Sequence, residues 1–183
     1  MALQRKRVAI LVEDDFLDSE LLEPLKAMKD AGVQVTIVGP GTKDVFRGKH
    51  GAAIRADAAA KDVRGSDFDA VIIPGGYAPD KMRLQPAMIN LVKDANQAGR
   101  IVAAVCHGPQ LLISADIVRG RTATCWPSIA VDLKNAGANY VDKPVVRDGN
   151  LITSRKPEDL PQFSAAILDA LSGKTSTQTR MNI

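Results

Sequence analysis

Short apolar runs recur along this chain of 183 residues, and they alternate with segments that have the spacing of an amphipathic helix over most of its length. The runs cover residues 8–12, 33–38, 70–74 and 101–105, and Val, Ile and Ala make up most of them. Continuous apolar runs of this length are typical of parallel strands that are buried on both faces. Their alternation with helices predicts an α/β fold, in which helices cover both faces of a mostly parallel central sheet.

The apolar spacing also indicates the extent of the domain. Helical spacing continues to Leu171, and a hydrophobic content of 45% is enough for one compact core. From Gly173 onward the chain is rich in Ser and Thr and has no apolar periodicity. We therefore expect a single domain over residues 1–172 and a flexible tail over residues 173–183.

Local patterns predict several further elements. Residues 39–65 are polar and interrupted by glycine, which indicates an excursion from the main sheet with a short hairpin around residues 51–55. Later in the chain, we expect a helix over about residues 128–136. A pair of strands that turns at residues 148–149 should precede the last helix.

The first helix has recognisable ends. Asp18 or Ser19 can act as its N-cap, and Gly32 should end it before the second strand. Its apolar residues recur with helical spacing, so they are expected to share one buried face. These residues are Leu21, Leu22, Leu25 and Met28.

The charge pattern argues against a nucleic-acid partner. The net charge is +3, from 24 basic and 21 acidic residues, and most of the basic residues are scattered. They form no stripe that could follow a phosphate backbone. Four Phe, two Tyr and one Trp are too few to build a platform for base stacking.

The chain carries no signal for a membrane. No apolar run approaches the ~20 residues that a membrane-spanning helix requires. The N-terminus lacks the apolar region and cleavage site of a signal peptide. We therefore expect a cytoplasmic protein, in which Cys106 and Cys125 remain free thiols.

The sequence predicts neither a metal site nor a cofactor. The two histidines and two cysteines lie far apart except at residues 106–107, which is not the spacing of a zinc site. Residues 173–175 resemble the end of a phosphate-binding loop, but Leu168 occupies the place of its first glycine.

Cys106 is the leading candidate for a nucleophile. It follows a strand without polar residues and precedes a helix, so it lies at a sharp strand-to-helix turn like that of nucleophile elbows. A helix N-terminus or a neighbouring cation would lower the pKa of its thiol and supply thiolate at neutral pH. The alternative is an inert cysteine in the core, because cysteine is among the most buried residue types.

Three polar side chains could assist Cys106, and each has a structural alternative. His107 is the candidate base, although it could instead cap a helix; His50, the other histidine, is expected to have a structural role. Glu20, when protonated, could donate a hydrogen bond to the sulfur, or it could simply favour the start of its helix. Asp80 could orient His107 or cap a loop.

Residues around this edge of the sheet could shape the pocket. Gly75 and Gly76 follow a strand and offer unobstructed N–H groups for an oxyanion, although a plain tight turn would use the same residues. Trp126 is expected to form a pocket wall, and its neighbour Cys125 is expected to be a spare thiol.

Several of these segments together resemble one known family. They are Glu20 four residues before Pro24, residues 48–51, the Ile-Pro-Gly-Gly of residues 73–76 and the Ala-Val-Cys-His-Gly-Pro-Gln-Leu of residues 104–111. They are similar to the PfpI-type intracellular protease and protein deglycase family, and the similarity extends over about residues 8–171. The Cys-His-Gly-Pro block is its most specific part.

The resemblance implies a flavodoxin-like three-layer sandwich that assembles as a homodimer or as a hexamer of dimers. It implies that Cys106 and Glu20 form the reactive pair. In the protease-like branch an acid from a neighbouring subunit orients the histidine, and the matching position is Asp80, where that branch usually has a longer glutamate. Leu17 and Trp126 also depart from patterns in the family, which favours His107 as the base.

The resemblance further implies a cysteine-dependent hydrolase that acts on reactive carbonyls, either methylglyoxal and glyoxal or their early adducts on protein side chains. Two alternatives remain open. One is an intracellular cysteine peptidase, and the other is a non-enzymatic oxidative-stress sensor or chaperone that uses Cys106. Glutamine amidotransfer is excluded, because no histidine follows His107.

Overall fold

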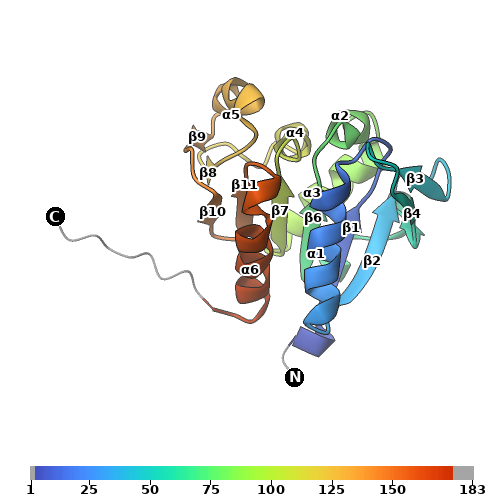
Figure 1. Cartoon of the computed structure of the whole chain (residues 1–183). Coiled ribbons are helices and arrows are strands. Elements are labelled where there is room, and N and C mark those ends of the chain that lie inside the picture. Colours follow the sequence, from blue (N-terminus) through green and yellow to red (C-terminus); the bar gives the residue numbers. More distant parts are fainter. Residues whose placement is uncertain (1–2, 175–183) are drawn as a thin grey trace.

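The computed structural model describes residues 3–174, and its centre is a seven-stranded sheet in the order β10-β11-β7-β6-β1-β2-β5 (Figure 1). All neighbouring strands are parallel except the edge pair of β10 and β11. This arrangement confirms the predicted mostly parallel sheet. The strands are β1 (Arg7–Leu11), β2 (Gln34–Gly39), β5 (Ala58–Ala59), β6 (Ala70–Ile73), β7 (Ile101–Val105), β10 (Val145–Asp148) and β11 (Leu151–Ser154).

Helices cover both faces of the sheet and complete the three layers. Helices α1 (Asp18–Asp30) and α6 (Leu160–Leu171) lie side by side on one face, and α3 (Pro86–Gln97) and α4 (Pro109–Ser114) lie on the other (Figure 1). The apolar residues of β1 and β6 have no exposed surface, because helices pack on each side of them. Burial on both faces explains why these strands are continuous apolar runs in the sequence.

The first helix differs from its predicted start. It begins at Asp18 after Leu17, whose side chain makes no capping hydrogen bond, so the prediction of an Asp18 or Ser19 cap is wrong. The Asp18 carboxylate instead accepts the backbone N–H groups of His50 and Ala52, at 3.0 and 2.8 Å. Gly32 ends the helix with a φ of 80°, as predicted.

The predicted buried face of α1 is partly wrong. Leu21 and Met28 have no exposed surface and Leu25 is half-buried, but Leu22 is 39% exposed. Successive residues on a helix are about 100° apart, so Leu21 and Leu22 cannot both point into the same core.

The polar excursion contains the expected hairpin, although it is longer than predicted. Strands β3 (Val45–Arg47) and β4 (Ala53–Arg55) pair antiparallel. The chain then returns to the main sheet, where β5 pairs with β2. A strand of two residues has too short a pattern to be recognised in the sequence.

Other short elements complete the chain. Strands β8 (Thr122–Ala123) and β9 (Asn139–Tyr140) form a separate parallel pair. The helix expected over residues 128–136 is a 3₁₀ turn (Pro127–Ile129) followed by α5 (Ala130–Asn135). Helix α2 (Ala78–Met82) follows β6. The remaining 3₁₀ turns are Leu3–Arg5, Ala60–Asp62, Gly65–Asp67 and Pro157–Asp159.

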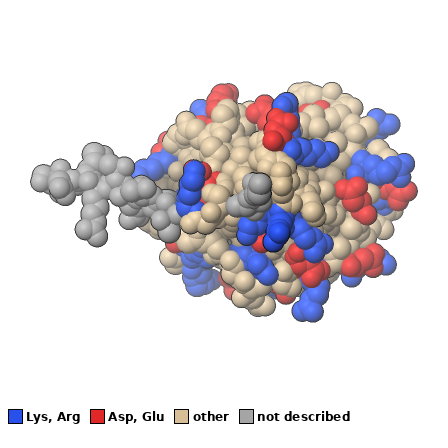
Figure 2. All heavy atoms as spheres, turned by 90° about the horizontal axis from the view of Figure 1, so that it is seen from below, with Lys and Arg blue, Asp and Glu red and all other residues tan. Residues whose placement is uncertain are grey.

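Figure 2 shows the underside, at the amino ends of the strands, where acidic and basic side chains are interspersed. Asp69 there pairs with Lys6 at 3.5 Å and with Arg100 at 3.9 Å. Within residues 3–174, no helix has both the length and the apolar character that crossing a membrane requires. Most of the predicted flexible tail, residues 175–183, lies outside the described part of the chain.

Leu21 and Leu22 offer a matched test of the packing on α1. Leu21→Ala should lower the free energy of unfolding by about 2–5 kcal/mol, because it leaves a cavity in the core. Leu22→Ala on the same helix should cost less than about 1 kcal/mol, because part of its side chain already contacts water. Urea titration of both variants measures the difference, and equal losses would contradict this description of the helix.

Candidate active site

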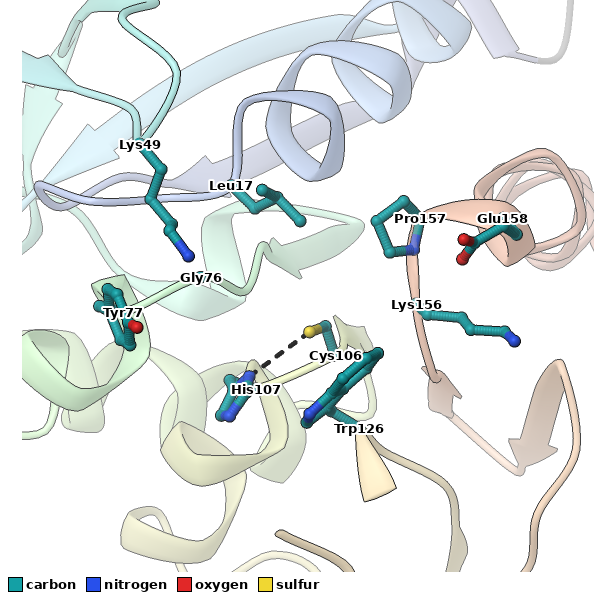
Figure 3. A pocket seen from close by; sticks show the side chains of 10 residues that line it. All are labelled: Leu17, Lys49, Gly76, Tyr77, Cys106, His107, Trp126, Lys156, Pro157 and Glu158. Atoms are coloured by element: carbon teal, nitrogen blue, oxygen red, sulfur yellow. Dashed lines mark hydrogen bonds between the residues drawn. The ribbon is translucent and has the colours of Figure 1, made fainter. Parts of the chain in front are cut away.

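The carboxyl ends of β1, β6 and β7 meet at one edge of the sheet, where an open pocket of about 460 Å³ lies. Glu20 reaches this edge from α1, Gly75 and Gly76 from the turn after β6, and Cys106 from the turn after β7. Open α/β sheets bind their ligands at this kind of position. The pocket is lined by Leu17, Lys49, Gly76, Tyr77, Cys106, His107, Trp126, Lys156, Pro157 and Glu158 (Figure 3).

Cys106 lies in a sharp turn that exposes its side chain to the pocket. Its φ is 61°, in the left-handed region that non-glycine residues rarely adopt. The turn is tight because the N–H of Gly108 donates to the carbonyl of Val105 at 2.8 Å. A side chain at Gly108 would come within 2.7 Å of the Ile73 carbonyl oxygen, so only glycine fits there. This is the geometry of a nucleophile elbow.

The surroundings of the Cys106 sulfur act on its pKa in opposite directions. Burial and the neighbouring Glu20 carboxylate raise the pKa of the thiol well above its ordinary value. The backbone N–H groups of His107 and Gly76 hydrogen-bond to the sulfur and lower the pKa, but by less. The prediction that a helix N-terminus or a neighbouring cation lowers this pKa is therefore wrong for the single chain.

Glu20 is a buried carboxyl group next to the thiol. Its Oε2 accepts the N–H of Gly75 at 2.8 Å, and its side chain hydrogen-bonds to Cys106. Burial raises the pKa of Glu20 to about 7, although these hydrogen bonds and the charge of Lys49 lower it. A thiolate and a carboxylate side by side in this buried space would repel each other at a large cost in free energy. After one of the two groups has lost its proton, the other therefore keeps its own. Because the pKa of Glu20 is about 7 and that of Cys106 is well above its ordinary value, Glu20 gives up its proton first.

Only glycine fits at positions 75 and 76, for a different reason at each. A Cβ on Gly75 would overlap Glu20 Oε2 and come within 2.9 Å of the Cys106 Cβ. Gly76 has a φ of 77° and approaches the Asp15 carbonyl oxygen closely. Their N–H groups face the Glu20 carboxylate and the Cys106 sulfur, respectively. The N–H of Gly75 is thus bound by Glu20, and the role of both residues toward an oxyanion stays a prediction.

His107 lies beside the sulfur and against Trp126. Its Nδ1 is 3.4 Å from the Cys106 Sγ, and its Nε2 is 3.4 Å from the Ser128 hydroxyl oxygen. The His107 and Trp126 rings stack at 6.4 Å between centroids with an interplanar angle of 27°. Burial and the charge of Lys49 lower the pKa of His107, so the imidazole is neutral at pH 7 and can accept a proton.

Some candidate residues lie elsewhere. Asp80 is exposed on α2 and makes no contact with His107 within residues 3–174, so it cannot orient that ring from its own chain. His50 is exposed, and its backbone N–H binds Asp18. Cys125 is fully buried, and burial together with Asp132 raises the pKa of its thiol to about 12. No cluster of three potential metal ligands occurs in the described residues.

The sequence alone did not identify several residues that line the pocket. Lys49 lies in the segment between Gly48 and Gly51 that contributes to the family resemblance, but nothing in its pattern places its side chain at the pocket. Tyr77 and residues 156–158 likewise follow strands at this edge without a distinctive motif. Ser128 reaches His107 from 21 residues away, a separation that carries no local signal.

The comparison with known protein families agrees with this geometry. The profile of the DJ-1/PfpI family matches residues 6–170. The chain belongs to this family. General stress protein 18 of Bacillus subtilis is 44% identical over 91% of this chain and 98% of its own length. Protein/nucleic acid deglycase 2 of Escherichia coli is 40% identical over the same shares of the two chains.

A solved structure shows the same fold. It is a two-domain protein of Anabaena variabilis with DJ-1/ThiJ/PfpI-like and ferritin-like domains, and it superposes on this chain with a TM-score of 0.91 at 44% identity. The alignment covers 97% of this chain and 52% of the Anabaena chain. The resemblance to the PfpI and deglycase family and the flavodoxin-like sandwich are thus both confirmed.

Glu20→Gln should remove a pH-dependent loss of stability. Because the pKa of Glu20 rises from 4.5 to about 7 on folding, the folded protein holds this proton more tightly than the unfolded chain does. Glu20 therefore costs stability progressively as the pH rises from 4.5 to 7, by up to about 3 kcal/mol. Relative to Glu20→Gln, the wild type should lose this free energy of unfolding between pH 4.5 and pH 7. Urea titration at several pH values measures the difference.

Glu23 is the matched control on the same helix, because its side chain is exposed. Glu23→Gln should leave the pH profile of stability unchanged, since the Glu23 side chain faces solvent and lies outside the buried pair. A constant difference between the wild type and Glu20→Gln at all pH values would mean that the folded state does not raise the pKa of Glu20.

Proposed function

We propose that this DJ-1/PfpI-family protein is a cysteine-dependent hydrolase of reactive carbonyl compounds. Its substrates would be methylglyoxal and glyoxal, or their early adducts on Cys, Lys and Arg side chains. The observation that carries the proposal is a thiol in a strained turn, next to a buried carboxyl group, at an open pocket. The name of the Escherichia coli deglycase, a relative at 40% identity, supports this substrate class.

The reaction with methylglyoxal begins at the sulfur. The Cys106 thiolate attacks the aldehyde carbon, a C–S bond forms, and the electron pair of the C=O bond moves to the oxygen. The attacking form is the one in which Glu20 holds the proton and the sulfur holds the charge, a minor form of the pair because the pKa of the thiol is raised. The pocket is wide enough for so small a substrate, because its volume is about 460 Å³.

Proton transfer and hydrolysis complete the cycle. Neutral His107 can move the proton from the former aldehyde carbon to the neighbouring carbon, which converts the adduct into a lactoyl thioester. Water then cleaves the C–S bond and releases lactate and the thiolate. The sum is methylglyoxal plus water to lactate plus a proton, and glyoxal gives glycolate in the same way.

Removal of Cys106 provides the decisive test, and the second cysteine is its control. Cys106→Ala should abolish lactate formation from methylglyoxal, because no other thiol lines the pocket. Cys125→Ala should keep most of the activity, since this buried thiol lies outside the pocket lining. His107→Ala should lower kcat by about 10²–10⁴-fold, the usual contribution of a general base.

The same assay separates the alternatives. If the wild type produces no lactate and deglycates no protein but cleaves peptides, it is an intracellular peptidase. If it turns over none of these substrates while peroxide oxidises Cys106, the sensor or chaperone role takes the place of the enzyme. We rank the peptidase below carbonyl hydrolysis, because the loops at the carboxyl ends of the strands are short and offer little surface to grip a polypeptide.

We also propose that the protein is cytoplasmic and acts as a homo-oligomer, with Asp80 contributing to a neighbouring subunit. Asp80 is exposed in the first turn of α2, where a second copy could meet it. Asp80→Ala should then lower kcat without changing the fold, and light scattering should give the mass of a dimer or hexamer. A monomeric mass with full Asp80→Ala activity would contradict this arrangement.

A further inference from the structure

One cation projects into the pocket beside Cys106. Lys49 lies in the loop between β3 and β4, and its ammonium points toward Gly76 (Figure 3). The Lys49 Nζ lies 4.4 Å from the centroid of the Tyr77 ring, whose π face attracts a cation. Lys43 and Lys81 pair with nearby aspartates, whereas Lys49 pairs with no carboxylate of residues 3–174.

The backbone holds Lys49 in this position. Its N–H donates to the Phe16 carbonyl at 2.9 Å, and the preceding Gly48 N–H donates to Ala52 at 2.8 Å. The Asp18 carboxylate closes the loop by accepting two N–H groups from it. A side chain at Gly48 would overlap the Asp18 carboxylate, so the loop lies directly against α1.

The other charged residues of the pocket lie on the opposite wall. Lys156 and Glu158 flank Pro157 there, and the Lys156 ammonium points away from Cys106 (Figure 3). Lys49 is therefore the lysine whose charge acts on the reactive groups. Its charge lowers the pKa of both Glu20 and His107, although burial has the larger effect on each.

Attack by the thiolate creates a negative charge on the substrate oxygen, which needs hydrogen-bond donors or a cation beside it. The substrate oxygen becomes negative as the C–S bond forms, and enzymes commonly bind such an oxygen with N–H donors. Here the N–H of Gly75 binds Glu20, and those of Gly76 and His107 bind the sulfur. The Gly75 donor is therefore engaged by Glu20, and the other two are shared with the sulfur.

We propose that Lys49 is a catalytic residue that binds the substrate oxygen on which negative charge develops. The inference rests on the proposed function, because it assigns the oxygen of the same carbonyl that Cys106 attacks. The Lys49 ammonium donates a hydrogen bond to this oxygen while the electron pair of the C=O bond moves onto it. When the thioester is hydrolysed, the carboxylate of the lactate product forms next to the same ammonium. The pocket therefore favours anionic groups beside the sulfur.

Alkylation of Cys106 tests the anion position without any turnover. Iodoacetate and iodoacetamide react with the same thiolate and release iodide, but only iodoacetate carries a negative charge. The ratio of their rate constants therefore reports a cation beside the sulfur, whatever the thiol pKa is. Lys49→Met should lower this ratio by about fivefold, and Lys49→Arg should preserve it. Lys156→Met is the control and should leave the ratio unchanged.

Kinetics with methylglyoxal test the catalytic role. Lys49→Met should lower kcat/KM by about tenfold after division by the iodoacetamide rate constant, which corrects for any change in thiolate supply. We expect less than the 10²–10³-fold loss of a buried oxyanion donor, because Lys49 is exposed. Lys49→Arg should recover most of the activity, and Lys156→Met should remain close to the wild type.

The outcomes separate this inference from the proposed function. Equal alkylation ratios in Lys49→Met and Lys156→Met would overturn the anion position. A lower ratio with an unchanged corrected kcat/KM would overturn the catalytic role. If the wild type turned over no carbonyl compound, the proposed function and the catalytic role would both fail, but the alkylation ratio would still decide whether Lys49 binds anions beside the thiol.

Discussion

A thiol and a carboxyl group occupy one buried space that can carry only a single negative charge without a large cost in free energy. The rest of the site follows from that constraint. Gly75 must lack a side chain so that Glu20 can reach the thiol, and its N–H fixes the orientation of the carboxyl group. The strained turn at Cys106 presents the sulfur to the pocket while burial keeps the proton within the pair.

The framework of the fold could be predicted because its signals are local. The run at residues 101–105 becomes β7 with unchanged ends, since both faces of that strand are covered. The apolar pattern stops abruptly at Cys106, and this change marks the turn between β7 and α4, which begins directly after Gly108. Gly32 ends the first helix because its positive φ is inexpensive only for glycine.

What the sequence did not reveal depends on contacts between distant segments. Asp18 was expected to cap its own helix, but it binds a loop 32 residues away, and no local pattern distinguishes these roles. The direction of the Cys106 pKa depends on Glu20, which lies 86 positions earlier, and on the burial of both. The pocket position of Lys49 depends in the same way on how the β3–β4 hairpin packs against α1.

The wall that carries Trp126 belongs to a lobe outside the main sheet, made of β8, α5 and β9. The backbone N–H of Trp126 donates to the Cys106 carbonyl at 2.9 Å, and that of Thr124 donates to the Thr153 hydroxyl at 2.9 Å. Main-chain donors do not depend on the identity of the side chains they accompany. Substitutions at Trp126 can therefore reshape this wall of the pocket while the reactive turn keeps its support.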